Sequence, residues 1–104
     1  MKNRVSPSKS AEQQAEAELC RALLVLANPE EARAFLHDLC TPAELQALVD
    51  RWRVVGLLRQ GLTYRQINDQ TGISVTTIGR VARFLADGNG GYLAVADRLD
   101  GETT

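Results

Sequence analysis

Hydrophobic positions along the chain recur at spacings of three and four residues, which is the pattern of amphipathic α-helices. From about Ala11 onward, Leu19, Leu23 and Leu26 fall on one face of a first helix. The stretch NPEE at 28–31 starts a second helix, because asparagine caps helices, proline suits the first turn and acidic residues favour the N-terminus. Both segments are predicted to be helices with wide apolar faces.

Start and stop signals divide the middle of the chain in the same way. A third helix is predicted to run to about residue 60, with Thr41 as its N-cap and Gly61 at its end. Thr63 then caps a short helix that extends through about residue 70, and Gln66 stands where it completes a capping box. Each boundary follows from residues within one helical turn of it.

Glycines punctuate the last part of the chain. Gly72 suits a left-handed turn position, and Ser74 caps a helix over 75–86. The stretch DGNGG at 87–91 breaks that helix, and a last short helix follows over 92–99. No alternating strand pattern occurs, so the predicted fold class is all-α with about six helices.

At 104 residues the chain is expected to form one domain at most. We expect a flexible N-terminal arm over 1–10, a helical domain over 11–100 and a tail over 101–104. The first helices carry more apolar surface than the small helices near Gly72 can cover. That surface either closes a monomer core or interlocks with a second chain, and we favour a dimer because so small a monomer buries a modest core.

Residues 63–86 are predicted to form a helix-turn-helix. This motif needs an apolar residue in its first helix, left-handed geometry at the turn and apolar anchors in its second helix. These inward-facing roles are assigned to Ile67, Gly72, Ile73, Val75, Ile78 and Val81. Asn68 stands where the motif usually has alanine, so either the two helices cross more widely or the Asn68 side chain bonds to the turn.

Polar side chains remain for the outer face of this motif. Short hydroxyl side chains and arginine at the start of a helix suit a DNA major groove, because they allow close approach and donate to base edges or phosphates. The predicted DNA-binding residues are Thr63, Tyr64, Arg65, Ser74, Thr76, Thr77, Arg80 and Arg83. The alternative is a purely structural corner in a helical protein–protein interaction module.

Charge is unevenly distributed along the chain, although the formal net charge is only −1. Six arginines but a single acidic residue, Asp69, lie between residues 51 and 85, and the rest of the chain is acidic. A basic patch on an acidic body steers one face toward a polyanion, whereas the alternative is an ordinary solvated helix surface. Charge alone does not decide between these interpretations.

Other residue types argue against an enzyme. The sequence has no nucleophile–base pair, no phosphate-cradling glycine loop and no metal-ligand constellation, so no catalytic residue, cofactor or metal is expected. Cys20 and Cys40 are expected to be reduced and buried. Trp52 is expected to pack in the core, and His37 to lie at a surface or interface.

The N-terminal residues are polar and lack the apolar core of a signal peptide, and no apolar run reaches membrane-spanning length. The sequence therefore predicts a cytoplasmic, nucleoid-associated protein without a membrane partner.

The segments LCTPAELQALVDRWRVVGLLRQGLTYRQI and TGISVTTIGRVARFL show a family resemblance in order and spacing. With them the chain resembles the Trp repressor family over roughly residues 15–100, and more closely its YerC/YecD-type branch, of which the ending GNGGY is typical. The resemblance implies an intertwined, all-helical homodimer whose two reader heads fit successive major grooves of a palindromic operator.

The resemblance also implies a small-molecule pocket. Thr41, Arg51 and Arg80 fall on polar positions that contact the corepressor, whereas Val81 and Phe84 replace a small glycine and a serine that line the indole slot. Phe84 is expected to occupy volume that an indole ring needs, so we do not expect tryptophan to bind, and another effector remains open. The predicted function is sequence-specific binding of double-stranded DNA by a homodimeric transcriptional regulator, a repressor.

Overall fold

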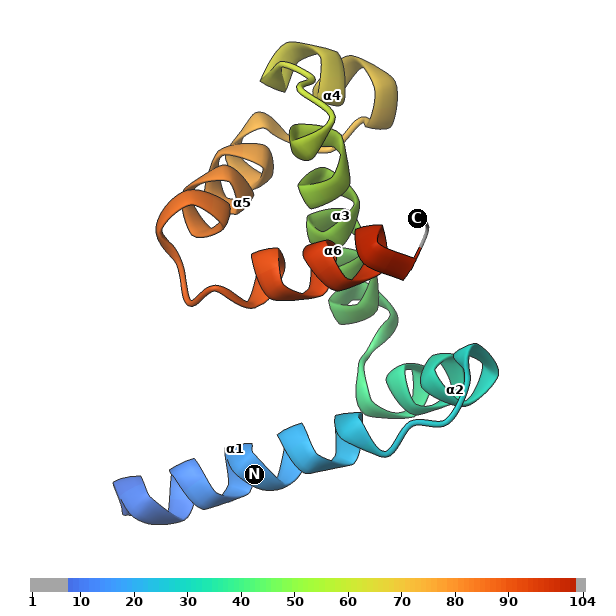
Figure 1. Ribbon diagram of the computed structural model, residues 1–104, viewed down its shortest axis with the longest axis vertical. Coiled ribbons are helices and arrows are strands. Elements are labelled where there is room, and N and C mark those ends of the chain that lie inside the picture. Colours follow the sequence, from blue (N-terminus) through green and yellow to red (C-terminus); the bar gives the residue numbers. More distant parts are fainter. Residues whose placement is uncertain (1–7, 103–104) are drawn as a thin grey trace. The chain divides into compact units, whose positions relative to one another are not determined.

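The computed structural model describes residues 8–102, and within this range every regular element is an α-helix. Figure 1 labels the helices along the chain. The helices are α1 (Lys9–Leu24), α2 (Pro29–Leu39), α3 (Pro42–Arg59), α4 (Tyr64–Thr71), α5 (Val75–Asp87) and α6 (Gly91–Glu102). The predicted all-α class with about six helices is confirmed. The chain divides into an N-terminal unit, Met1–Thr41, and a C-terminal unit, Pro42–Thr104.

The first and last helices extend further toward the two ends of the chain than predicted. The Ser8 hydroxyl accepts a hydrogen bond from the Ala11 amide at 3.2 Å, and this cap lets α1 begin at Lys9. Residues 9–10, assigned to the flexible arm, are therefore helical. At the other end, α6 includes residues 101–102 of the predicted tail. The rest of the predicted arm and tail, residues 1–7 and 103–104, lies outside the described residues.

The N-terminal unit contains two helices joined by a capped turn. The Asn28 side chain accepts from the Glu31 amide at 2.8 Å, and the Glu31 carboxylate accepts from the Ala27 amide at 3.0 Å. This reciprocal pair fixes the start of α2. No residue of α1 or α2 is buried, and Leu24 and Val25 are 84% and 76% exposed. The described part of this unit therefore has no buried core of its own.

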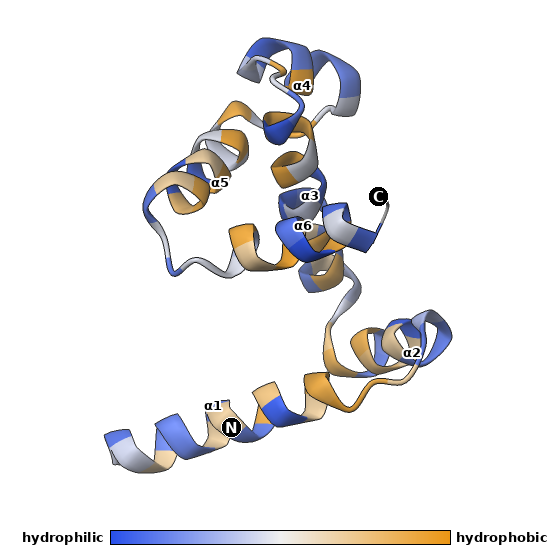
Figure 2. Ribbon diagram, viewed as in Figure 1, coloured by the Kyte–Doolittle hydropathy of each residue, from blue (hydrophilic) through white to orange (hydrophobic). Residues whose placement is uncertain are grey.

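The C-terminal unit has a small aliphatic core. Each of its four helices contributes to this core, as does the turn between α4 and α5. Figure 2 shows hydrophobic residues along α3, α5 and α6, whereas α4 is almost entirely hydrophilic. The buried residues are Val54, Val55, Ile67, Ile73, Ile78, Val81 and Ala96. Because α3 and α4 both pack against α5, this core sets the orientation of the helix-turn-helix.

The end of α3 leads into the helix-turn-helix through a glycine. Gly61 has a φ of 89°, and its amide donates to the Leu58 carbonyl at 3.0 Å. The Leu62 amide donates to the Leu57 carbonyl at 3.3 Å, which completes a Schellman motif. The predicted helix end at Gly61 is confirmed, and it directs the chain into α4.

Candidate nucleic-acid interface

The first helix of the predicted motif begins with a capping box. The Thr63 hydroxyl accepts from the Gln66 amide at 3.1 Å, and the Gln66 side-chain oxygen accepts from the Thr63 amide at 2.8 Å. Both partners are exposed, so the box fixes the backbone where the chain enters α4 without adding to the core. This part of the prediction is confirmed. Tyr64 and Arg65, in the first turn of α4, are both exposed.

Gly72 occupies the left-handed turn position, with a φ of 77°. Its amide donates to the Asn68 carbonyl at 2.8 Å, and the Asn68 side-chain amide donates to the Ile73 carbonyl at 2.9 Å. The Thr71 hydroxyl adds a second bridge, since it donates to the Ile67 carbonyl at 2.7 Å and accepts from the Ile73 amide at 3.0 Å. Asn68 therefore bonds to the turn, as one of the two interpretations of its presence required.

Ser74 caps α5. Its hydroxyl oxygen accepts from the Thr77 amide at 3.1 Å and lies 3.1 Å from the Thr77 hydroxyl. Thr77 is half-buried and engaged in this cap, whereas Thr76 is exposed. The two threonines are therefore not equivalent, which their adjacent positions in the sequence did not indicate.

Val75 departs from the prediction. It was expected to anchor α5 in the core, but 54% of it is exposed. The other two apolar anchors predicted on α5, Ile78 and Val81, are buried. Val75 is the first residue of α5, and because helical side chains are tilted toward the N-terminus, a side chain at this position extends beyond the end of the helix.

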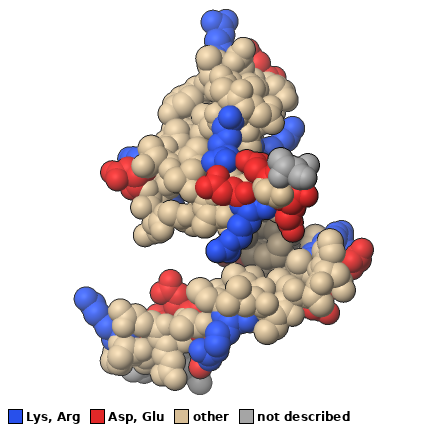
Figure 3. Space-filling model, in the orientation of Figure 1, with Lys and Arg blue, Asp and Glu red and all other residues tan. Residues whose placement is uncertain are grey.

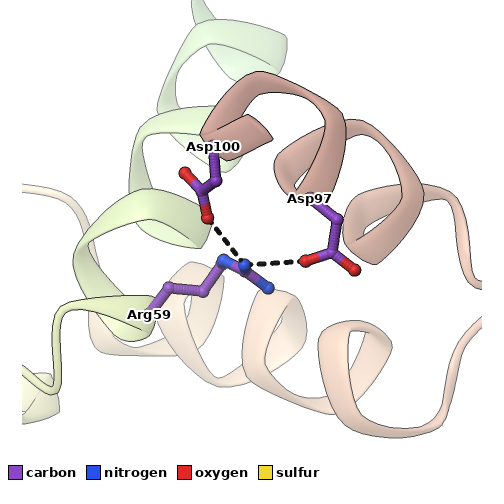
Figure 4. A network of polar contacts seen from close by, with 3 residues as sticks. All are labelled: Arg59, Asp97 and Asp100. Carbon is purple, nitrogen blue, oxygen red and sulfur yellow. Dashed lines mark hydrogen bonds and ion pairs between the residues drawn. The ribbon is translucent and has the colours of Figure 1, made fainter. Parts of the chain in front are cut away.

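Six arginines lie between residues 51 and 85, in and before the helix-turn-helix, but one of them, Arg59, is held by ion pairs. Arg59 donates to Asp97 and to Asp100, both at 2.9 Å, and Figure 4 shows the guanidinium of α3 between the two carboxylates of α6. These hydrogen bonds, that of Asp100 first, raise the pKa of Arg59 because they favour its charged form. Arg59 therefore ties α6 to α3 instead of contributing to a basic surface.

The other arginines of the motif remain available. Arg65, Arg80 and Arg83 are exposed, and among residues 8–102 none of the three forms an ion pair. Figure 3 shows acidic side chains gathered over α6 and a basic side chain projecting from the α4 end of this unit. The predicted charge asymmetry is thus present within the C-terminal unit, although it is one arginine smaller.

A cavity of about 480 Å³ is lined by residues of α3, α5 and α6 and of the joint between α5 and α6. Its walls are formed by Arg51, Trp52, Arg80, Phe84, Asn89, Gly91, Tyr92 and Val95. Arg51, Arg80 and Phe84 are thus brought together as predicted. Val81 is buried in the core and Thr41 belongs to the N-terminal unit, and neither lines this cavity.

Two aromatic side chains shape the cavity walls. Trp52 packs against Tyr92 with ring centroids 6.4 Å apart, but it remains 39% exposed, so the prediction of a core tryptophan is only partly correct. Phe84 has Arg80 over its ring at 4.8 Å and Arg83 at 5.8 Å, measured from each Cζ to the ring centroid. Arg80 is one helical turn from Phe84, a spacing from which this contact could have been anticipated.

Comparisons with known proteins agree with this geometry. A family model described as Trp repressor protein matches residues 14–100. The chain belongs to the Trp repressor family. YerC of Bacillus subtilis, an uncharacterised protein, is 43% identical over 82 residues, which are 79% of each chain.

Two solved structures of Trp repressor-like proteins have the same fold. A TrpR-like protein from Eubacterium eligens superposes with a TM-score of 0.80 at 40% identity, covering 89% of this chain and 96% of the other. A candidate Trp repressor from Staphylococcus aureus also superposes with a TM-score of 0.80, at 38% identity, covering 90% and 96%. The Trp repressor family is a family of regulators. The resemblance that the central segments indicated is confirmed.

Some residues of this Trp repressor family member differ from their predicted environments. Cys20 is exposed and Cys40 half-buried, so the prediction of two buried cysteines is wrong for Cys20, and both are free thiols. His37 is exposed, and residues 8–102 contain no group of three potential metal ligands. Over the same residues, no helix is long and apolar enough to cross a membrane.

Proposed function

We propose that the chain binds double-stranded DNA in a sequence-specific manner, as a homodimeric transcriptional repressor acting at a palindromic operator. One observation carries the proposal: α4 and α5 are joined by a turn that side-chain hydrogen bonds of Asn68 and Thr71 hold, and they present exposed Thr76, Arg65, Arg80 and Arg83. A short hydroxyl side chain at the start of the second helix, with arginines on both helices, matches major-groove recognition. Membership of the Trp repressor family supports the same conclusion.

The distribution of buried residues supports the homodimer. No residue of α1 or α2 is buried, and leucines on both helices are exposed. The C-terminal unit adds exposed Leu93, Val95 and Leu99 on α6. Isolated surface leucines are ordinary, but two helices without any buried residue need a partner to account for their apolar faces. A second copy of this chain would cover them.

DNA binding is proposed not to respond to tryptophan. Phe84 stands in the wall of the cavity next to Arg80, at the position where the family resemblance implies a serine that lines the indole slot. A different small molecule could act as an effector in the remaining volume, and its identity is open. We propose a cytoplasmic, nucleoid-associated location, which follows from DNA binding.

The exposed apolar faces of α1 and α2 also fit a second function, a helical module that binds another protein while its helix-turn-helix is only structural. The two functions differ in their dependence on salt. DNA binding through arginine displaces condensed counterions and weakens steeply as salt rises, whereas apolar association does not.

The test is selection of bound DNA from a random duplex pool, followed by titration of the recovered duplex and a scrambled version over a range of salt concentrations. The proposal expects a palindromic consensus, preference for the recovered duplex and a negative slope of log affinity against log salt. Equal binding of recovered and scrambled duplexes would overturn sequence specificity. Binding that salt does not weaken would favour the protein-interaction module.

A further inference from the structure

The Phe84 ring is the one aromatic face among the described residues with two arginines over it. We propose that Phe84 is a positioning residue that holds the guanidinium groups of Arg80 and Arg83 ready for DNA phosphates. The proposal rests on the proposed DNA-binding function. It assigns to Phe84 a role different from filling the volume of a ligand site.

The geometry on α5 favours this role. Arg80 precedes Phe84 by four residues and Arg83 by one, and their Cζ atoms lie 4.8 Å and 5.8 Å from the ring centroid. A guanidinium within about 6 Å of an aromatic face is attracted by the negative potential of the ring. Both arginines are exposed, whereas Phe84 is half-buried. The ring is therefore the more fixed partner, and the arginines adopt their positions around it.

The kind of group that holds an arginine side chain decides whether its positive charge is offset. Arg59 shows the alternative in this chain, because two carboxylates hold it and offset its charge. Arg80 and Arg83 form no ion pair within residues 8–102. An aromatic ring orders a guanidinium without neutralising it, so both arginines keep their full attraction for a polyanion.

Ordering before binding improves affinity. A free arginine side chain loses rotamer freedom when it engages a phosphate, and this loss opposes association. If the ring already restricts Arg80 and Arg83, part of that loss has occurred in the free protein. Removal of the attraction should weaken DNA binding by at most roughly five- to thirtyfold if both contacts contribute at the strength of exposed pairs.

The test distinguishes the electrostatic effect of the Phe84 ring on the arginines from the effect of its shape. Phenylalanine with one, two, three and five ring fluorines is incorporated at position 84, which weakens the negative face stepwise and changes the volume little. The chain has a matched control, because Phe35 on α2 is its other phenylalanine and no arginine stacks on its ring in the described structure. Each protein is titrated with a short mixed-sequence DNA duplex at several salt concentrations, and its melting temperature is recorded.

The proposal expects affinity to fall with each added fluorine at position 84, with an unchanged melting temperature and no such trend at position 35. Phe84→Tyr should retain affinity and Phe84→Leu should lose it. Affinity that is independent of fluorination at position 84, or that falls equally in the Phe35 series, would overturn the proposal. Wild-type protein that fails to bind the duplex at any salt concentration would instead overturn the DNA-binding function on which the proposal rests.

A measurement without DNA distinguishes the two failures further. Protons on the side chains of Arg80 and Arg83 should show upfield ring-current shifts in the NMR spectrum of the wild type, and Phe84→Leu should remove them. Ring-current shifts that persist in Phe84→Leu, or that are absent from the wild type, would overturn the positioning role whatever the protein binds.

Discussion

Thr76 and Thr77 stand side by side at the start of α5, yet their hydroxyl groups are in different states. The Thr77 hydroxyl lies 3.1 Å from that of Ser74 and takes part in the helix cap. Thr76 is exposed, and its hydroxyl has no partner among residues 8–102. A side chain that is already engaged in a cap is less available to a base edge. Of the two threonines, Thr76 is therefore the better candidate for reading sequence.

Thr76→Ala is expected to cost on the order of 1 kcal/mol of binding free energy on the preferred duplex and little on unrelated DNA. Thr77→Ala should have the smaller effect on discrimination. Competition between preferred and scrambled duplexes measures both. Should Thr76→Ala and Thr77→Ala both retain full discrimination, α5 is not the reading helix and the interaction-module function takes its place.

Arg65 belongs to a different class of contact. It is exposed in the first turn of α4, the helix before the reader, from which a side chain reaches the phosphate backbone. Phosphate contacts fix register but carry no sequence information. Arg65→Ala should therefore weaken binding to preferred and unrelated duplexes alike and lower the salt slope by roughly one unit. Arg65→Lys, which keeps the charge, is the matched control, and a selective loss on the preferred duplex would contradict the assignment.

Among the elements, the joints of the helix-turn-helix were the most predictable part of the structure. The Thr63–Gln66 capping box, the Ser74 cap and the turn at Gly72 are all confirmed, because each depends on residues within one helical turn. Contacts between distant segments were not predictable in the same way. The partners of Arg59 lie 38 and 41 residues away, and no local pattern identifies them. The exposure of Val75 was not predicted, because the spacing of apolar residues along α5 does not show which of them are buried at its first turn.

The turn between α4 and α5 gives a prediction about stability. Gly72 has a φ of 77°, which costs a residue with a side chain about 1–2 kcal/mol, although a Cβ at this position would meet no atom within 4 Å. Gly72→Ala should therefore lower the free energy of unfolding by about that amount, through backbone strain alone. Gly72→Asn should lose less, because asparagine tolerates left-handed geometry. Denaturant midpoints check this, and an alanine variant as stable as the wild type would contradict it.

At the scale of the whole molecule, the cavity bears on the response to tryptophan, and the N-terminal unit bears on the oligomeric state. The cavity retains about 480 Å³, with Phe84 in its wall. If Phe84 occupies the volume that an indole ring needs, L-tryptophan should change neither the melting temperature of the protein nor its affinity for DNA. Phe84→Ser is the companion variant, because it enlarges the cavity and supplies a hydroxyl. A tryptophan-dependent rise in either quantity for the wild type would contradict a tryptophan-independent regulator.

The apolar faces of α1 and α2 lead to the prediction of an obligate dimer. Leu19 and Leu23 lie one turn apart on α1 and are both exposed, and neither helix of the N-terminal unit has a buried residue. A chain of 104 residues that leaves such surface in water would be marginally stable, so we expect sedimentation to show a dimer at micromolar concentration. Leu19→Lys combined with Leu23→Lys should dissociate or unfold it and abolish DNA binding.

Gln14→Lys is the matched control, because residue 14 lies on the opposite face of α1 and adds the same kind of charge. It should sediment as the wild type does. A stable, folded wild-type monomer at micromolar concentration would contradict the dimer. It would leave the exposed leucines of α1 without a second copy to cover them, and a different protein would then be the partner to seek.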